Sequence, residues 1–238
     1  MVQLLTNRLG SYIDPLLYLK ACGEILALLF AVSWVVSVVF SPAEIASNPL
    51  NARLGYYSLC VGFDHSPANR IALAVYIPTA YFGIRYVWTD TQRAELERSR
   101  LSAAQYWFTV CSNGLYALSL SIFGLVFLEN PFINVYGHTG LFVQLILLRF
   151  VVVAANFYEA PEVSEGSKVF LGVYGVISLV TPVLFLVSFL SYDKTGEHLL
   201  PWQITAAFDY GWFICLVLTT KYLPSCPRIK VDYQLEQT

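Results

Sequence analysis

The chain has 238 residues, of which 57% are hydrophobic and only 13% are charged, whereas soluble domains average about 25% charged residues. This composition, with its long uncharged runs, excludes an ordinary soluble domain and indicates an integral membrane protein. The formal net charge of −2 gives no basis for binding nucleic acid, and no nucleic-acid partner is expected.

Six apolar stretches, each long enough to cross a bilayer, follow one another along the chain. Each can cover a hydrocarbon core of about 30 Å, and only helices satisfy their own backbone at that depth without closing a barrel. We therefore predict an all-α polytopic membrane protein, a bundle of six transmembrane helices forming a single domain over 1–238. The predicted spans are residues 18–40, 67–88, 103–128, 139–158, 169–192 and 200–222, with short cytoplasmic tails at both ends.

The distribution of Lys and Arg predicts the orientation, because cytoplasmic segments carry the excess of these residues. With both termini in the cytoplasm, ten basic residues fall inside and three outside, so we predict an N-in, C-in topology. The outer three are Arg53, Arg70 and Lys194, and the inner ten are Arg8, Lys20, Arg85, Arg93, Arg98, Arg100, Lys168, Lys221, Arg228 and Lys230.

Two connecting segments are longer than the rest. Segment 41–66 contains LGYYSLCVGF, which is too apolar to be freely solvated, so we expect it to lie on the membrane surface or to cap the bundle. Segment 89–101, TDTQRAELERSRL, is charged and favours a helix, and it is expected to be a solvated extension of the second or third span. Glu159, with Glu162 and Glu165, is likewise interpreted as part of a solvated acidic loop.

The fourth span carries a permanent cation, Arg149, in the middle of LILLRFVVVAANF. An intramembrane Arg costs about 2.5–3.5 kcal/mol, so it must face protein or water and not lipid. At about 100° per residue, His138 and Asn156 fall on the same helix face, which predicts one polar stripe pointing into the bundle. Asn113 in the third span is also expected to face the interior and to hydrogen-bond across helices.

Asp209 in the sixth span is the expected partner of Arg149. The two spans run in the same direction, and the charges lie at matched depths, about 15 Å and about 13.5 Å from the predicted span starts. We therefore predict a bidentate ion pair at the bilayer midplane. Such a pair has two interpretations: it fixes which helices pack together, or it belongs to a site that binds an anionic headgroup or translocates an ion.

Glu24 is the remaining acidic candidate within a span. Lys20 lies one turn before it on the same face, and the simplest interpretation is an i,i+4 pair that neutralises both charges. Small residues repeat every four positions nearby, which predicts the close approach of a neighbouring helix. They are Gly23, Ala27 and Ala31.

No motif for metal, phosphate or cofactor chemistry occurs in the chain. HExxH, Cys/His clusters and glycine-rich phosphate loops are missing, and the five cysteines are isolated, so no cofactor and no metal site are expected. A lipid-directed enzyme stays open as an interpretation, with His138 or His198 at the outer face as its suspects. No nucleophile motif accompanies either histidine.

Two short motifs resemble a known family. The acidic-aromatic centre of the last span, Asp209-Tyr210-Gly211-Trp212, and the start of the fourth span, His138-Thr139-Gly140, are similar to positions in the DRAM-type family of six-helix membrane proteins. That family includes autophagy modulators and relatives involved in GPI-lipid remodelling, and it often has a Glu-Trp pair where this chain has Asp209 and Trp212. The resemblance implies an endomembrane or lysosomal protein that handles lipids or regulates trafficking, with no cofactor.

These observations favour a non-enzymatic multi-pass membrane protein that associates with lipids or acts as an accessory or scaffold subunit of a membrane assembly. The alternative is an ion or small-anion carrier or channel that uses the same intramembrane charges. Expected partners are membrane lipids and other membrane-protein subunits. The expected location is the membrane of an intracellular organelle, either endomembrane or mitochondrial.

Overall fold

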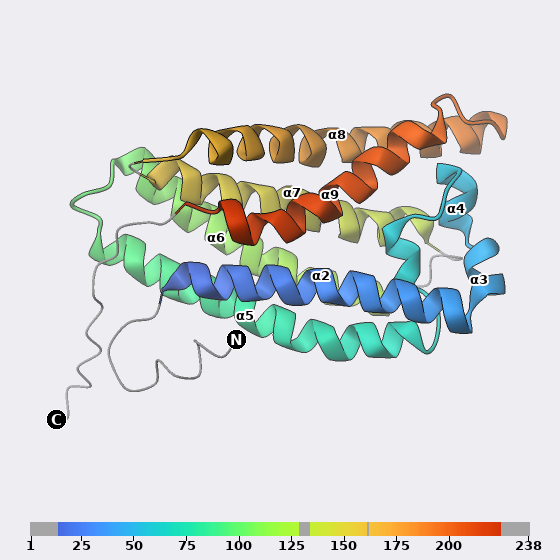
Figure 1. The fold of residues 1–238 in the computed structure, drawn as a ribbon, viewed down its shortest axis with the longest axis horizontal. Helices are drawn as coiled ribbons and strands as arrows, with labels where there is room; N and C mark the ends of the chain where they lie inside the picture. Colours follow the sequence, from blue (N-terminus) through green and yellow to red (C-terminus); the bar gives the residue numbers. More distant parts are fainter. Residues whose placement is uncertain (1–13, 129–133, 161, 225–238) are drawn as a thin grey trace.

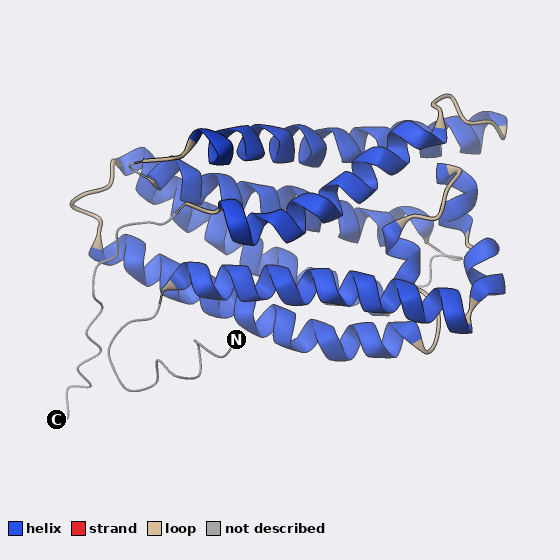
Figure 2. Ribbon diagram, viewed as in Figure 1, coloured by secondary structure: helices blue, strands red, loops and turns tan. Residues whose placement is uncertain are grey.

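The computed structural model describes residues 14–128, 134–160 and 162–224, and every regular element within these ranges is helical (Figure 2). The long helices are α2 (Pro15–Phe40), α5 (Ala68–Leu96), α6 (Ala103–Phe123), α7 (Val135–Glu159), α8 (Glu165–Thr195) and α9 (Trp202–Tyr222). The shorter elements are α3 (Pro42–Ala46), α4 (Pro49–Leu54) and the 3-10 helices η2 (Leu59–Phe63) and η3 (Gly124–Phe127). The predicted all-α fold is confirmed for this part of the chain.

Five helices are long and apolar enough to cross a membrane: α2, α5, α6 together with η3, α7 and α8. This composition agrees with a multi-pass membrane protein. Helix α9 is not among the five, because the aromatic and polar residues around Asp209 lower the hydropathy of its first half. The composition of α9 therefore does not identify it as a sixth span. Only its packing against the other helices bears on that assignment.

Capping residues explain why the helices begin and end a few residues away from the predicted spans. Helix α2 begins at Pro15 because the Asp14 carboxylate accepts a hydrogen bond from the Leu16 amide. Helix α8 begins after Ser164, whose hydroxyl accepts from a first-turn amide, and ends at Gly196 with a φ of +73°. Helix α5 differs most, since it continues beyond residue 88 to Leu96.

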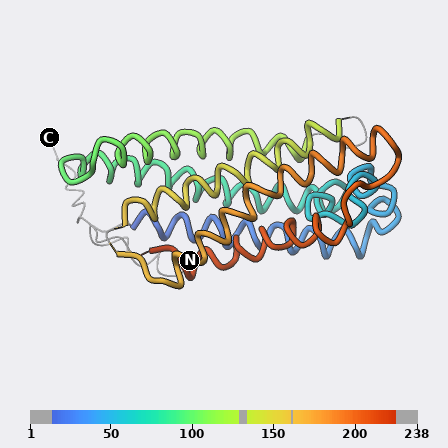
Figure 3. The backbone as a smooth tube through the Cα atoms, turned by 90° about the horizontal axis from the view of Figure 1, so that it is seen from above, coloured from blue at the N-terminus to red at the C-terminus, as the bar shows by residue number. Residues whose placement is uncertain are grey.

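The long helices form a closed ring in chain order. Each packs against the next one along the chain, and α9 closes the ring against α2 (Figures 1 and 3). Consecutive helices run in opposite directions (Figure 1). We call the end that carries α3, α4 and η2 the loop end, and the end where α2 begins and α9 stops the far end.

Aromatic side chains fill the centre of the ring. Trp212 has no exposed surface, and the rings of Phe30 and Phe142 meet it edge-on with centroids 5.8 and 5.5 Å away. At the loop end, all five residues of η2 are buried, and η2 packs against α2 and α5. Of the two alternatives predicted for segment 41–66, lying on the membrane surface or capping the bundle, the burial of η2 supports the cap.

Candidate functional site

The residues predicted to form one intramembrane polar site lie in four separate places. Arg149 is in the middle of the bundle, while Asp209 and His138 contact the cap at the loop end. Asn113 and Asn156 belong to a network nearer the far end. Glu24 lies exposed on α2. The other five are buried, but no single site unites them.

Arg149 projects from α7 and has no exposed surface. One guanidinium nitrogen, Nη1, donates to the Tyr116 hydroxyl on α6 at 2.7 Å, and Nη2 donates to the Leu19 carbonyl on α2 at 3.0 Å. Among the described residues, no carboxylate lies within ion-pairing distance, and Nε has no hydrogen-bond partner. The predicted pair with Asp209 is wrong, because neutral acceptors on two other helices hold the cation.

Gly23 makes the contact with the Leu19 carbonyl possible. Within α2 that carbonyl faces the Gly23 amide one turn later, and its second lone pair remains free to accept from Arg149. A Cβ atom at Gly23 would lie only 2.6 Å from Arg149 Nη2. The glycine therefore makes room for a guanidinium from α7, and the close approach of a neighbouring helix that was predicted here stays a prediction.

Asp209 on α9 anchors the cap. Its Oδ2 atom accepts hydrogen bonds from the Ser58 hydroxyl at 2.8 Å, the Leu59 amide at 3.1 Å and the Tyr56 hydroxyl at 3.1 Å. Burial, and after it the Asp209 carboxylate, holds the pKa of Tyr56 well above its usual range, so the phenol stays protonated and donates. The carboxylate thus joins the loop to α9 and takes no part in a helix–helix ion pair.

His138 attaches α7 to the same cap. Its Nε2 lies 3.0 Å from Asp64 Oδ1, and both side chains are fully buried, although the contact is not an aligned hydrogen bond. The other Asp64 oxygen accepts from Asn48 Nδ2 at 2.7 Å. His138, Arg149 and Asn156 all face inward, as the helical period predicts, but each contacts a different group of residues.

Near the far end, a charged cluster that we did not predict joins α5 to α7. Arg93 contacts Asp90 Oδ1 through Nε at 2.8 Å and Glu97 Oε2 through Nη1 at 2.7 Å, while Nη2 contacts Glu159. The Arg93 side chain is 9% exposed, so these bonds form largely out of water. We call Asp90, Arg93, Glu97 and Glu159 the far-end cluster; in it, one guanidinium fork holds three carboxylates.

Neutral side chains extend the far-end cluster to α6 and α7. Asn113 Nδ2 donates to Asp90 Oδ2 at 2.9 Å, which confirms the predicted hydrogen bond across helices. Asn156 Nδ2 donates to the Tyr86 hydroxyl at 2.8 Å, and Tyr86 donates in turn to Asp90 at 3.2 Å. Three neighbouring helices are therefore joined by one hydrogen-bonded network.

Two predictions about the far end need correction. Segment 89–101 does extend the second span, but Asp90 and Arg93 on it are buried instead of solvated. Glu159 is also not solvated: its side chain is 3% exposed and contacts Arg93 and Thr109. Charged residues look solvated in a sequence when some of their partners are distant in the chain, as Glu159 is from Arg93 and Asn113 is from Asp90.

Glu24 is exposed on α2, and the structure shows no ion pair between it and Lys20. The predicted i,i+4 pair is therefore wrong. Lys20 is only partly buried and lies nearer the far end of α2. Glu24 consequently has no neutralising partner among the described residues.

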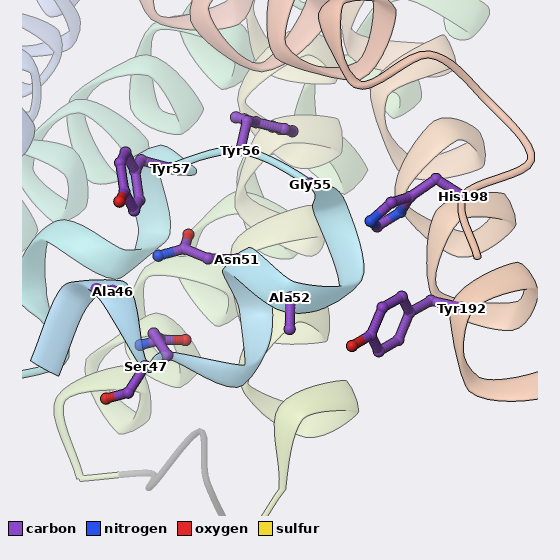
Figure 4. Close-up of a pocket in the computed structure, with 10 residues that line it drawn as sticks. Ala46, Ser47, Asn51, Ala52, Gly55, Tyr56, Tyr57, Tyr192 and His198 are labelled. Carbon is purple, nitrogen blue, oxygen red and sulfur yellow. The ribbon is translucent and has the colours of Figure 1, made fainter. Parts of the chain in front are cut away.

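A hollow of about 750 Å³ opens at the loop end between α4 and the end of α8 (Figure 4). Tyr192 and His198 stand on one side with their rings stacked 5.3 Å apart, and Asn51 and Ala52 stand across from them (Figure 4). The residues that line it are Ala46, Ser47, Asn48, Asn51, Ala52, Gly55, Tyr56, Tyr57, Tyr192 and His198.

The hollow offers aromatic rings and neutral polar groups. None of its lining residues is a Lys, Arg, Asp or Glu. Beside the hollow, Arg53 and Asp193 form an ion pair that joins α4 to α8, with Nε 2.9 Å from Oδ1. The arrangement therefore fits an uncharged polar group better than an anion.

Weak signals in the sequence could have identified part of these sites. Tyr116 follows Asn113 by one helical turn and so shares its inward face. Asp90, Arg93 and Glu97 have the i,i+3 and i,i+4 spacing of a helical ion-pair series. Nothing local indicated that Asp64 would lie beside His138, 74 positions away along the chain.

Within the described ranges, no group of three or more His, Cys, Asp or Glu side chains is placed to hold a metal ion. No family model, curated protein or solved structure matches this chain. Function must therefore be inferred from the geometry of these sites.

Proposed function

We propose that this chain is a non-enzymatic multi-pass membrane protein that binds lipid headgroups and serves as an accessory subunit of a membrane assembly. The observation that carries the proposal is the contrast between its interior and its loop end. Buried polar groups contact one another inside the bundle, whereas the loop end has an open, uncharged hollow. The DRAM-type resemblance points in the same direction and stays a prediction.

The proposal includes α9 as the sixth span and places both termini in the cytoplasm. Helix α9 has 21 residues, a length of about 31 Å, and it fills the gap in the ring between α8 and α2. The loop end then lies outside. A membrane-impermeant thiol reagent should label Ser47→Cys in intact membranes, and Arg98→Cys only after permeabilisation; the opposite pattern would invert the topology.

The complete burial of Arg149 and Asp209 supports a structural role for these charges. Arg149 has no exposed surface and uses two of its nitrogens within the protein. Asp209 is equally buried, and one of its carboxylate oxygens accepts hydrogen bonds from the cap. Because the polar groups form separate clusters and not one continuous row, they favour holding the fold together over conducting an ion.

The hollow supports lipid binding. It lies at the end of the spans, the level at which headgroups meet the hydrocarbon, and its volume is within the range of about 300–1,000 Å³ that is usual for small-ligand sites. Stacked Tyr192 and His198 offer an aromatic face, and the Tyr57 side chain is exposed. A hydroxyl-rich, uncharged headgroup such as a hexose matches this lining.

The test compares two tryptophan variants of the full chain in lipid nanodiscs. Ala52→Trp places an indole in the hollow, and Ala43→Trp adds the same group at an exposed site on α3 that does not line it. By native mass spectrometry, wild type and Ala43→Trp should retain galactosyl-diacylglycerol in preference to phosphatidylglycerol with the same acyl chains, and Ala52→Trp should lose this preference. Equal retention by all three proteins would refute a headgroup site in the hollow.

An anion carrier is the second candidate, and one observation favours it: Arg149 has no carboxylate partner among the described residues. Chloride flux into vesicles that contain the purified protein separates the two proposals. The structural proposal expects no flux above that of empty vesicles. Flux that disappears in a folded Arg149→Gln variant would instead establish the carrier.

A further inference from the structure

Glu24 occupies an unusual place for a carboxylate. It lies about 13.5 Å along α2 from Pro15, in a helix of about 39 Å, and so well inside the hydrocarbon if α2 spans the membrane. Its side chain is exposed, and no hydrogen bond or ion pair to another described residue reaches it. Asp209 and Glu159, by contrast, are buried and bonded.

Glu24 belongs to an uncovered stripe of α2. The exposed residues follow it at alternating spacings of four and three, the seven-residue repeat of a helix that packs against another helix. We call them the Glu24 stripe: Glu24, Leu28, Ala31, Val35 and Val38. Other faces of α2 pack on α5, η2 and α9 (Figures 1 and 3), so the described part of the chain leaves this stripe open.

A carboxylate that faces acyl chains is costly, at about 2.5–3.5 kcal/mol for Asp on insertion scales, and intramembrane charges usually meet a partner. A cation at the same depth on another helix would neutralise Glu24 and restore its hydrogen bonds. The apolar and small residues of the stripe allow a helix to approach closely, since Ala31 projects little from the backbone.

We propose that a transmembrane helix of another protein, carrying a Lys or Arg at the depth of Glu24, packs against the Glu24 stripe. A second copy of this chain fits less well, because parallel two-fold packing on the stripe would set Glu24 against its own counterpart. The proposal deepens the accessory-subunit part of the proposed function. Its failure would leave headgroup binding in the hollow unaffected.

Two synthetic peptides test the proposal on the full chain in lipid vesicles. Both are polyleucine transmembrane helices with a dansyl acceptor, and one carries a single Lys a third of the way across. Energy transfer from the protein's tryptophans should reach half-saturation at about tenfold lower peptide density for the Lys peptide, a difference of about 1.4 kcal/mol. Glu24→Gln should abolish this difference without changing the melting temperature, because the residue is exposed.

A matched pair of variants tests the surface itself. Ala31→Trp adds bulk within the Glu24 stripe, and Leu179→Trp adds it on the exposed face of α8. Only Ala31→Trp should weaken binding of the Lys peptide. The proposal is overturned if both peptides bind wild type equally, if Glu24→Gln keeps the difference, or if both tryptophan variants act alike. A dimer of the wild-type chain that Ala31→Trp disrupts would also overturn it, in favour of a second copy.

Discussion

Asp209 at the loop end and Arg149 in the middle of the bundle are both fully buried charges, yet the protein holds them differently. Asp209 is held by a loop, through two hydroxyls and the Leu59 amide. Arg149 is held by helices, through the Tyr116 hydroxyl and the Leu19 carbonyl within α2. Each charge is held by hydrogen bonds with a different kind of group, although Asp209 Oδ1 and Arg149 Nε have no hydrogen-bond partner among the described residues.

The helix backbone accounts for the difference. A helical carbonyl has two lone pairs and uses one within the helix, so it can still accept a hydrogen bond from a guanidinium. A helical amide has one hydrogen, which the helix already uses, so a carboxylate needs side chains or a non-helical amide. A buried Arg can therefore donate hydrogen bonds to the backbone carbonyls of helices. A buried Asp in such a bundle instead needs donors from side chains or from a loop that folds into the bundle.

The largest expected effect comes from removing the acceptor at Asp209. Asp209→Leu leaves the three cap donors without their acceptor and should lower the free energy of unfolding by about 3–5 kcal/mol. Asp209→Asn retains an amide oxygen and should cost about 1 kcal/mol. Unfolding in mixed micelles titrated with dodecyl sulfate measures both. Thiol labelling should detect release of the cap in the Leu variant, because Cys60 is fully buried in η2.

Equal stability of the Asp209→Leu and Asp209→Asn variants would show that the loop does not depend on the carboxylate. Burial, with the Asp209 charge as the next cause, raises the pKa of the Cys60 thiol. Cys60 in the folded wild type should therefore react slowly even in alkaline buffer, whereas the exposed Cys111 does not report on the cap. Fast labelling of Cys60 in the wild type would contradict a closed cap.

The next effect sharpens the Arg149 side of the comparison. Gly23→Ala places a methyl group where Arg149 Nη2 lies and should cost about 3 kcal/mol, from overpacking and the loss of the Leu19 hydrogen bond. Gly114→Ala is the control, because a Cβ there meets no atom within 4 Å. That variant should be neutral or more stable by up to about 1 kcal/mol. Equal behaviour of the two variants, in the same unfolding titration, would refute the close approach.

The smallest effect concerns the second bond of Arg149. Tyr116→Phe removes the hydroxyl but keeps the ring, whose centroid lies 5.7 Å from the guanidinium carbon. Loss of a hydrogen bond to a charged group should cost about 2 kcal/mol. Tyr81→Phe removes a hydroxyl from an exposed ring and should change the melting temperature little. A neutral Tyr116→Phe would mean that the Leu19 carbonyl alone is enough for Arg149.

Much of the fold was predictable, but the pairing of its charges was not. We predicted the Arg149–Asp209 pair from the depth of each residue along its helix. Depth does not tell toward which neighbouring helix a side chain points, and it does not reveal that a loop folds into the bundle. The same reasoning missed the far-end cluster, because Arg93 and Glu159 look solvated until the fold brings their side chains, one from α5 and one from α7, into contact.

The sequence alone determined that the chain is helical, where its apolar helices lie, and which residues of a helix face inward. Hydrophobicity and the 3.6-residue period are properties of neighbouring residues, so they can be read locally. Only the tertiary structure decided what each buried charge contacts. Arg149 and Leu19 are 130 positions apart, and Asp209 and Ser58 are 151 apart. Such contacts depend on how the helices and the cap are arranged in space, which no local pattern records.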